Sequence, residues 1–326
     1  MGRYLVSGAA GFIGARVSEL LLGEGHTVVG VDNLNHAYDV RLKEYRLKRL
    51  QNLPGFEFHE EDISDRAAME ALGPAVGDLD GIINMAARAG VRSSVENPWI
   101  YLNTNVTGTL NLLELCRKQR NPKFILASTS SIYGSVASQP TKEDADSSRP
   151  LQPYAATKKA AEVLCHSYHH LHGVDVTIFR FFTVYGPAGR PDMSIFRFIQ
   201  WIYEERPLTV FGDGNQSRGF TFVDDIARGV ILGLKLVGYD LFNLGGHEVI
   251  VINDLIAQIE AIAGKTAQIE HRPRHPADML SSWADVEKAR RILGWAPQVA
   301  FRDGLAEAIE WYQCERTWAS QVNTEV

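Results

Sequence analysis

The stretch Ser7-Gly8-Ala9-Ala10-Gly11-Phe12-Ile13-Gly14 decides the fold of this chain. It follows a short apolar run and precedes a segment with helical apolar spacing. Gly8 permits a tight turn, Gly11 lets backbone N–H groups approach a pyrophosphate, and Gly14 lets the helix lie close to the sheet. A Gly-x-x-Gly-x-x-Gly pattern between a strand and a helix therefore predicts a dinucleotide-binding unit.

A second strand, predicted at Thr27-Val28-Val29-Gly30-Val31, supports this interpretation because it ends in Asp32, at the spacing that such units require. The carboxylate of Asp32 can accept hydrogen bonds from ribose hydroxyls, but it would repel a 2′-phosphate. The next residue, Asn33, is neutral where an arginine could bind that phosphate. These two residues favour NAD over NADP.

Strands and helices continue to alternate along the chain. Apolar strands are predicted at residues 56–59, 81–84 and 123–128, and a long amphipathic helix at 103–119. This alternation predicts right-handed crossovers and a Rossmann-type α/β fold with a doubly wound parallel sheet. Ligands of such sheets bind beyond the carboxyl ends of the strands, where these residues fall: Gly8, Asp32, Asp62, Ala86 and Thr129.

The composition is that of an ordinary globular chain of 326 residues, with 45% hydrophobic and 22% charged residues. Its net charge of -6 and the absence of a Lys/Arg run argue against nucleic acid or an anionic membrane as a partner. Three widely spaced cysteines predict neither a disulfide framework nor a zinc ribbon, and favour the reducing cytoplasm. No apolar run approaches membrane-spanning length, and the strand predicted at residues 3–6 leaves no room for a signal peptide.

The stretch Tyr154-Ala155-Ala156-Thr157-Lys158 is the candidate catalytic segment. Residues four apart share one face of a helix, so the Lys158 ammonium can lie beside the ribose of a bound nucleotide and lower the pKa of the Tyr154 phenol. A tyrosine with a pKa of ~10 is a poor base at neutral pH without such a neighbour. Taken alone, such a pair more often belongs to a solvated helix face.

Thr129 is the third candidate catalytic residue. A hydroxyl at a strand end near Tyr154 can orient or share the proton of a substrate hydroxyl. The alternative is a threonine that only terminates the strand. The glycine stretch, Asp32 and the Tyr154/Lys158 pair together favour the catalytic interpretation.

Four histidines, His166, His169, His170 and His172, cluster on one predicted helix. Histidines separated by three or four residues on a helix can bind a metal ion. No carboxylate or thiol obviously converges on them in the sequence. We therefore expect no metal site, and an exposed or subunit-facing helix.

Several motifs occur in an order typical of one protein family. They are Ser130-Ser131-Ile132-Tyr133-Gly134, Tyr154-Ala155-Ala156-Thr157-Lys158, Arg180-Phe181-Phe182-Thr183-Val184-Tyr185-Gly186-Pro187, Phe211-Gly212-Asp213-Gly214, Arg218-Gly219-Phe220-Thr221-Phe222-Val223-Asp224-Asp225 and Leu293-Gly294-Trp295-Ala296-Pro297. On these motifs essentially the whole chain resembles an extended short-chain dehydrogenase/reductase, of the group that contains nucleotide-sugar epimerases and dehydratases. Within that group it is most similar to UDP-glucuronate 4-epimerases, at Asp32-Asn33-Leu34-Asn35 and at Tyr185-Gly186-Pro187-Ala188-Gly189-Arg190-Pro191-Asp192-Met193.

The resemblance implies two domains. Residues 1–180 would form an NAD-binding Rossmann domain with the Tyr/Lys helix, and 181–326 a smaller α/β domain for a UDP-sugar, some segments of which return to the first domain. The implied cofactor residues are Gly8, Gly11, Phe12, Ile13, Gly14, Asp32, Asn33, Asn35, Asp62, Ile63, Met85, Ala86, Ala87, Ala89, Asn105, Tyr154, Lys158 and Phe181. The implied substrate residues are Arg88, Ser130, Ser131, Thr183, Arg190, Phe211, Arg218 and Asp278.

Two departures from the family pattern, Gly219 and His275 in place of Asp and Arg, leave the diphosphate contacts open. The remaining contacts follow from the resemblance alone. They are Thr183 with the sugar, Phe211 with the uracil, and Arg218 and Asp278 with the diphosphate and ribose.

The implied activity is an NAD-dependent 4-epimerisation between UDP-glucuronate and UDP-galacturonate through a 4-keto intermediate. Tyr154 would remove the C4 hydroxyl proton with help from Thr129, and Arg190 would hold the carboxylate of a β-keto acid that tends to lose carbon dioxide. Ser130 and Ser131 replace the acids that 4,6-dehydratases and decarboxylases carry there. Alternatives are a UDP-glucose/UDP-galactose 4-epimerase, a UDP-glucuronate decarboxylase, and, in another class, a non-enzymatic sensor, which would be expected to have lost Tyr154 or its lysine.

The helices predicted at 103–119 and 155–172 have apolar faces that could belong to the core. The resemblance implies instead that they form a four-helix contact between the subunits of a homodimer. The sequence leaves these two alternatives open.

Overall fold

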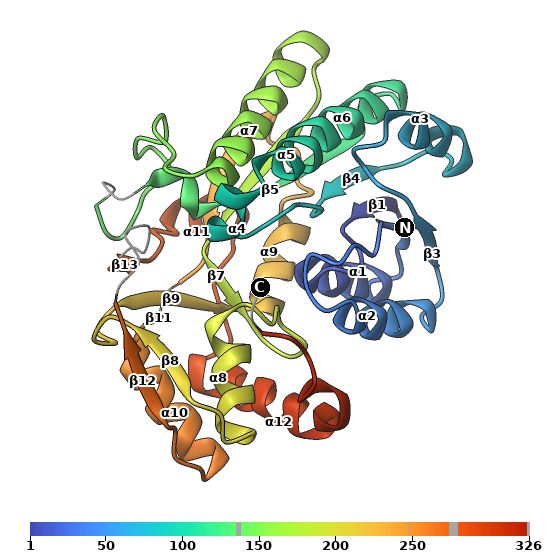
Figure 1. The fold of residues 1–326 in the computed structure, drawn as a ribbon. Helices are drawn as coiled ribbons and strands as arrows, with labels where there is room; N and C mark the ends of the chain where they lie inside the picture. Colours follow the sequence, from blue (N-terminus) through green and yellow to red (C-terminus); the bar gives the residue numbers. More distant parts are fainter. Residues whose placement is uncertain (135–137, 247, 274–279, 325–326) are drawn as a thin grey trace.

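The computed structural model describes residues 1–134, 138–246, 248–273 and 280–324. Its largest element is a seven-stranded sheet in which every pair of neighbours is parallel (Figure 1). The strand order is β10 (Tyr239–Leu244), β6 (Val176–Phe181), β5 (Lys123–Thr129), β4 (Gly81–Asn84), β1 (Arg3–Ser7), β2 (Thr27–Asp32) and β3 (Phe56–Glu60). The chain winds outward from β1 to β3 and then from β4 in the other direction. This order confirms the doubly wound prediction and puts the ligand-binding switch point between β1 and β4.

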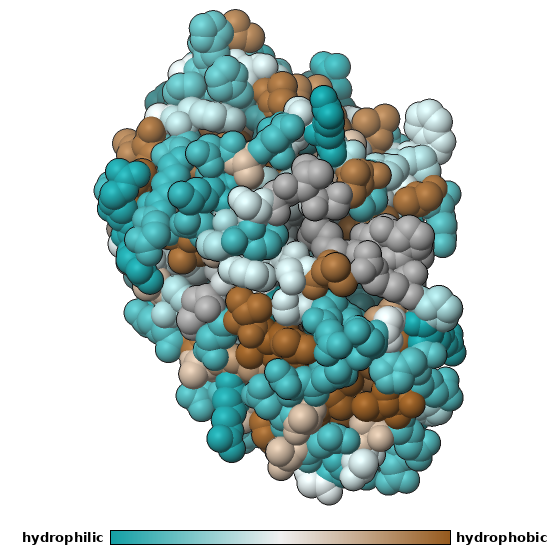
Figure 2. All heavy atoms as spheres, turned by 90° about the vertical axis from the view of Figure 1, so that its left-hand side faces the viewer, coloured by the Kyte–Doolittle hydropathy of each residue, from teal (hydrophilic) through white to brown (hydrophobic). Residues whose placement is uncertain are grey.

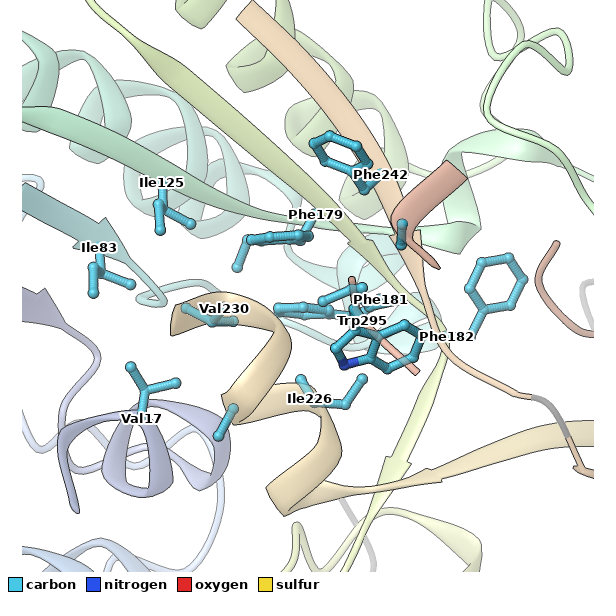
Figure 3. Close-up of a cluster of buried hydrophobic side chains, with 14 of the residues drawn as sticks. Val17, Ile83, Ile125, Phe179, Phe181, Phe182, Ile226, Val230, Phe242 and Trp295 are labelled. Atoms are coloured by element: carbon cyan, nitrogen blue, oxygen red, sulfur yellow. The ribbon is translucent and has the colours of Figure 1, made fainter. Parts of the chain in front are cut away.

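Helices bury both faces of this sheet. Neighbouring strand residues alternate between two cores, so that Leu5 lies in one core and Val6 in the other. Figure 3 shows the core that contains Val6, in which one helix presents Val230 toward Phe179 and Ile226 toward Trp295. Helices on this face are α1 (Phe12–Gly23), α9 (Val223–Leu232) and α11 (Glu287–Leu293), and those on the opposite face are α3 (Arg66–Ala75), α6 (Gly108–Lys118) and α7 (Pro153–His172). Burial on both faces explains the uninterrupted apolar runs of the strands.

The helix predicted at 103–119 is present, but residues 103–107 are π-helical and only the part from Gly108 to Lys118 is α-helical. The segment consists of α5 (Pro98–Tyr101), a π-helical turn η1 (Leu102–Thr107) and then α6. The hydroxyl of Thr109, at the start of α6, donates to the backbone oxygen of Asn105 in this turn at 2.7 Å. The wider turn brings the Asn105 side chain toward its partners in the site, which apolar periodicity could not reveal.

A second, smaller part of the chain packs below the sheet in Figure 1. Strand β9 pairs with β7, β11 and β13, while β8 and β12 form a separate parallel pair. The elements of this part are β7 (Thr183–Tyr185), α8 (Ser194–Tyr203), β8 (Leu208–Phe211), β9 (Ser217–Phe222), β11 (Glu248–Val251), α10 (Ile252–Ala263), β12 (Ile269–Arg272), β13 (Ser281–Ser282) and α12 (Phe301–Ala319). Strand β10 lies between these elements in sequence, yet it pairs with β6 of the large sheet. The chain thus crosses repeatedly between the two parts, and the domain division near residue 180 stays a prediction.

Helix α2 (Arg41–Gln51) forms a seam between the two parts. Its Leu42 packs in a small apolar cluster with Ala188, Phe196 and Val322. Among the residues that the structure describes, no helix combines the length and apolar content that a membrane span requires. On the face of the molecule seen in Figure 2, hydrophilic side chains separate the apolar ones into small patches.

Candidate active site

The glycine loop packs against the segment that follows β4. Gly8 has a φ of +71°, and a Cβ there would lie 2.7 Å from the backbone nitrogen of Ala86. A Cβ at Gly14 would lie 2.1 Å from the carbonyl oxygen of Gly8, so only glycine fits. Helix α1 begins at Phe12, and its N-cap, Gly11, has no side chain to bond the first turn. The backbone donors of this turn are therefore available to an anion.

Asp32 joins the glycine loop to the loop that follows β2. Its Oδ2 accepts a hydrogen bond from the backbone of Ala10 at 3.2 Å, and its Oδ1 accepts one from the backbone of Leu34 at 3.0 Å. The buried ammonium of Lys43 lies 3.4 Å from Asp32 Oδ1 and 3.3 Å from Asn35 Oδ1. Our sequence analysis missed Lys43, although the apolar spacing of Leu42, Leu47 and Leu50 could have indicated which face of α2 is buried.

Asn33 and Asp62 meet at the ends of β2 and β3. The side-chain amide of Asn33 donates to Asp62 Oδ2 at 2.7 Å, and Ser64 donates to Oδ1 at 2.7 Å. Burial alone would raise the pKa of Asp62, but these hydrogen bonds outweigh it and hold the pKa below its ordinary value. Arg88, expected at the substrate, donates to Asn35 Oδ1 at 2.8 Å. Its guanidinium therefore lies among the expected cofactor residues.

Asn105 holds the segment after β4 in place. It accepts a hydrogen bond from the backbone of Arg88 at 2.8 Å, and it donates to the Arg88 carbonyl at 3.0 Å and to Thr157 Oγ1 at 3.1 Å. The side chain is almost fully buried. Asn105 thus positions the backbone around Arg88 against α7.

Tyr154 lies in the first turn of α7, with its ring edge-on to Tyr101 at a centroid distance of 6.2 Å. Burial raises the pKa of Tyr154, while a hydrogen bond with Thr129 and the charge of Arg190 act to lower it. We expected Lys158 to lower this pKa. Among the described protein groups the structure gives that effect to Thr129 and Arg190, so this expectation needs correction.

Lys158 is buried on the same helix, with 2% of its surface exposed. Burial lowers the pKa of Lys158 to about 8, although the charge of Glu162 acts in the opposite direction. Glu162 lies one helical turn further along α7 and pairs with Arg180 of β6. Lys158 is therefore protonated at neutral pH but loses its proton more readily than an exposed lysine does.

Thr129 ends β5 and is bonded to the short helix η2 (Ser130–Tyr133). Its Oγ1 accepts a hydrogen bond from the backbone of Ser131 at 3.1 Å and donates to Ser131 Oγ at 3.2 Å. Phe181 is the Cα partner of Thr129 in the neighbouring strand β6. The end of β5 therefore presents a cluster of hydroxyls beside Tyr154.

Arg190 comes from the loop between β7 and α8. Its Nε and Nη2 donate to the two carboxylate oxygens of Asp192 at 3.0 and 2.6 Å, and Nη2 lies 3.5 Å from the carbonyl of Ala89. Thr183 begins β7 and pairs with Phe220 of β9. The structure thus brings Arg190 to the edge where Ala89 and Tyr154 lie.

Phe211 ends β8, and the guanidinium carbon of Arg92 lies 4.5 Å from its ring centroid. Arg92 belongs to α4 (Val91–Glu96), and our sequence analysis did not single it out. Arg218 lies on β9 and donates to the carbonyl of Ser217 at 2.7 Å. Asp278 and His275 lie outside the described residues.

The histidines of α7 do not form a metal site in the described part of the chain. No group of three or more His, Cys, Asp or Glu residues is placed to hold a metal ion among the residues described. The ring of His169 is bonded to the carbonyl of Val174 at 2.9 Å, and His166 packs edge-on against Tyr239. These histidines make structural contacts at the end of the helix.

Comparisons with known proteins agree with this architecture. The NAD dependent epimerase/dehydratase family matches residues 4–245. A UDP-glucuronate 4-epimerase of Thermodesulfobacterium geofontis is 53% identical over 95% of this chain and 96% of its own length. The crystal structure of a Bacillus cereus UDP-glucuronic acid 4-epimerase, in complex with UDP-glucuronic acid and NAD, matches with a TM-score of 0.90 and 37% identity over 96% of this chain and 99% of that one.

A more distant solved structure is that of UDP-glucose 4-epimerase from Thermotoga maritima with UDP-glucose. It matches with a TM-score of 0.89 and 30% identity over 96% of this chain and 99% of that chain. The expected family is thus confirmed over most of the chain. The chain belongs to the NAD dependent epimerase/dehydratase family.

Proposed function

We propose that this protein is an NAD-dependent UDP-glucuronate 4-epimerase, which interconverts UDP-glucuronate and UDP-galacturonate through a 4-keto sugar. The observation that carries the proposal is the convergence of Thr129 and Arg190 on the phenol of Tyr154, whose pKa both groups lower against burial. The reaction needs a base, a hydroxyl that shares its proton and a cation for the sugar carboxylate. The Thermodesulfobacterium geofontis relative is named for the same activity.

The glycine loop and Asp32 fit NAD. A Cβ at Gly14 would meet the carbonyl oxygen of Gly8, so the loop keeps its backbone close to the start of α1, where a pyrophosphate binds best. Asp32 at the end of β2 can accept hydrogen bonds from ribose hydroxyls. When bound, NAD supplies the hydride acceptor that makes oxidation and reduction of the sugar possible. The other cofactor residues expected from the sequence complete the proposed site.

Tyr154 would take the proton of the C4 hydroxyl and later return it, so its pKa decides how readily it acts. Thr129, held by its bonds to Ser131, orients the hydroxyl. Lys158 is protonated at neutral pH, with a pKa of about 8, and adds a positive charge on the same face of α7. These residues supply the proton transfer. Between the oxidation and the reduction, the keto sugar turns in the pocket.

The carboxylate of the sugar needs a firm hold, because oxidation at C4 produces a β-keto acid. Asp192 accepts hydrogen bonds from Nε and Nη2 of Arg190. No described residue accepts one from Nη1 of Arg190, and we assign this nitrogen to the sugar carboxylate. Neither Ser130 nor Ser131 is an acid that could donate the proton that a dehydratase or decarboxylase needs. The proposed UDP-sugar site is completed by Arg88, Thr183, Phe211, Arg218 and, outside the described residues, Asp278.

The test is to incubate the protein as purified with UDP-glucuronate, without added NAD, and to follow the sugar by proton NMR. We expect UDP-galacturonate to form, and NAD to be released when the protein is denatured, because an epimerase regenerates its cofactor. A UDP-pentose with carbon dioxide as the main product would identify a decarboxylase. Turnover of UDP-glucose alone would identify a UDP-glucose/UDP-galactose 4-epimerase, and binding without turnover a sensor.

We also propose a homodimer in the reducing cytoplasm. Trp99, Leu102 and Val163 are exposed on α5, η1 and α7, with 72%, 43% and 56% of their surface accessible. Apolar side chains on neighbouring helices fit a contact with a second copy of the chain. All three cysteines are free, in keeping with a reducing compartment. Light scattering should give twice the mass of one chain, and Trp99→Glu with Val163→Glu should halve it.

A further inference from the structure

Arg46 of α2 links two loops that are far apart in the sequence. Its Nη1 donates to the carbonyl of Ala10 in the glycine loop at 3.1 Å. Its Nε and Nη2 both donate to the carbonyl of Ala188 at 3.1 and 2.6 Å, and Nη2 lies 3.4 Å from the carbonyl of Gly189. Ala188 and Gly189 directly precede Arg190. One guanidinium therefore holds both the proposed pyrophosphate loop and the proposed carboxylate loop.

The charge of Arg46 is compensated in an unusual way. The side chain is buried, with only 4% of its surface exposed. Among the residues described, no carboxylate forms an ion pair with it, and its hydrogen-bond acceptors are backbone carbonyls and the Tyr38 hydroxyl, at 2.9 Å. The rings of Phe12 and Tyr38 lie 5.9 and 5.7 Å from its guanidinium carbon. Burying a cation against carbonyl dipoles is costly, so this arrangement needs a compensating gain.

The loop that contains Ala188 and Gly189 has a backbone conformation that needs support from its surroundings. Ala188 has a φ of +51°, in the left-handed region that a residue with a Cβ rarely occupies. Such a conformation persists only where surrounding contacts hold it. The two hydrogen bonds from Arg46 to the Ala188 carbonyl are contacts of this kind. The position of Arg190, two residues further on, therefore depends on Arg46.

We propose that Arg46 is a positioning residue that couples the cofactor loop to the carboxylate loop, so that uronate and NAD stabilise each other's binding. The inference rests on the proposed function, because it takes the pyrophosphate and the sugar carboxylate as the ligands of the two loops. Anything that orders the glycine loop then orders Arg190 as well. By linkage, a uronate held by Arg190 tightens NAD binding by the same factor by which NAD tightens uronate binding, and we expect the gain to appear as slower NAD release.

The experiment measures the rate of NAD release from the purified holoenzyme, with saturating UDP or with saturating UDP-glucuronate. UDP lacks the glucuronosyl group, carboxylate included, so the difference between the two rates measures the coupling through the sugar, and the Arg46 variant shows how much of it runs through the carboxylate loop. In the wild type we expect UDP-glucuronate to slow release about fivefold or more beyond the effect of UDP. Equal rates with both ligands in the wild type would refute the coupling.

Arg46→Lys is the decisive variant, because it keeps the charge but cannot span three carbonyls with a planar fork. We expect UDP-glucuronate to slow NAD release no more than UDP does in this variant. The matched control is Arg41→Lys on the same helix, since Arg41 bonds the carbonyl of Gln321 at 2.8 Å and touches neither loop. This control should keep the wild-type difference, and its loss there would show that any contact of α2 suffices.

If Arg46→Lys fails to fold, Tyr38→Phe provides a second test, because it removes only the 2.9 Å hydrogen bond between Tyr38 and Arg46. It should reduce the coupling in the same direction by a smaller factor. If both Tyr38→Phe and Arg46→Lys kept the wild-type difference between the two NAD release rates, the proposal would be overturned. Failure of the proposed function is recognised separately, by the absence of UDP-galacturonate in the NMR assay of the wild type.

Discussion

Two arginine–carboxylate pairs of the same geometry serve different purposes in this molecule. In each, the guanidinium donates from Nε and Nη2 to both oxygens of one carboxylate, from Arg180 to Glu162 and from Arg190 to Asp192. The first pair is 2% and 3% exposed, the second 26% and 20%. The first pair joins α7 to strand β6 of the sheet, and the second lies at the candidate active site.

The surroundings of the two pairs explain the difference. Glu162 also accepts a hydrogen bond from Ser128 at 2.6 Å, and Arg180 donates to Tyr133 at 3.0 Å. Burial alone would raise the pKa of Glu162, but the bonds from Arg180 and Ser128 hold it below its ordinary value. Arg190, in contrast, has a donor for which no described residue is an acceptor. A saturated pair fixes the scaffold, whereas an unsaturated one can bind a ligand.

The largest effect should come from the phenol of Tyr154, the proposed base. Tyr154→Phe removes the transferable proton and keeps the ring that packs on Tyr101. We expect kcat to fall by about 10² to 10⁴. Initial rates with UDP-glucuronate and a titration of UDP-sugar binding, which should change little, provide the check. Near-normal turnover would remove Tyr154 from the mechanism.

The second effect should appear in stability. Arg180→Met leaves Glu162 buried without its main partner, and Lys159 at 3.4 Å compensates only in part. Breaking a buried pair in this way costs about 3 to 5 kcal/mol of unfolding free energy, measurable by urea denaturation. The double variant Arg180→Met with Glu162→Met should recover most of that loss. A single variant as stable as the wild type would show that the pair does not fix the scaffold.

The third effect should be larger on the uronate than on a neutral sugar. Arg190→Ala removes charge-assisted hydrogen bonds worth about 1.5 to 3 kcal/mol each, so kcat/KM for UDP-glucuronate should fall about tenfold to a hundredfold. Some UDP-pentose should form as the keto acid loses carbon dioxide. Any turnover of neutral UDP-glucose should fall less, because it loses only the effect of Arg190 on the pKa of Tyr154, and the urea midpoint should stay near the wild-type value because the pair is partly exposed.

The comparison of both sugars decides the role of Arg190. An equal loss on UDP-glucuronate and UDP-glucose would mean that Arg190 supports the loop and does not bind the carboxylate. A wild type that prefers UDP-glucose would contradict the uronate assignment itself. Product ratios from proton NMR, with carbon dioxide quantified, distinguish these outcomes.

The contrast between the pairs also shows what could be predicted from the sequence. Gly8, Asp32 and Tyr154 follow local patterns, because a strand, a tight turn and a helix fix their positions within a few residues. The sheet was predictable for the same reason, since both of its faces are apolar. The family resemblance supplied Arg190, which no local pattern marks.

Lys43, Arg46 and Arg92 escaped the sequence analysis because long charged side chains on a helix usually belong to a solvated face. The burial of Lys43 and Arg46 depends on the seam between the two parts of the chain, which brings residues near 46 and 188 together. Arg92 is exposed, and only tertiary packing brings it to the ring of Phe211. Asn105 was expected from the family resemblance alone, because a π-helical turn breaks the 3.6-residue period around it. These misses share one cause, namely contacts that tertiary packing alone creates.

The smallest effect concerns a buried cation on α7, Lys158. Burial lowers the pKa of Lys158 to about 8 from its ordinary value of 10.5, so the folded protein disfavours the charged form. Between pH 8 and 10.5 the unfolded chain then binds more protons than the folded one, and stability rises with pH. From pH 7 to pH 9 the gain from this lysine should be roughly 1 kcal/mol. Urea denaturation at pH 7, 8 and 9 should show that gain in the wild type relative to Lys158→Met, whereas parallel curves for the two proteins would mean that Lys158 keeps its proton throughout this range.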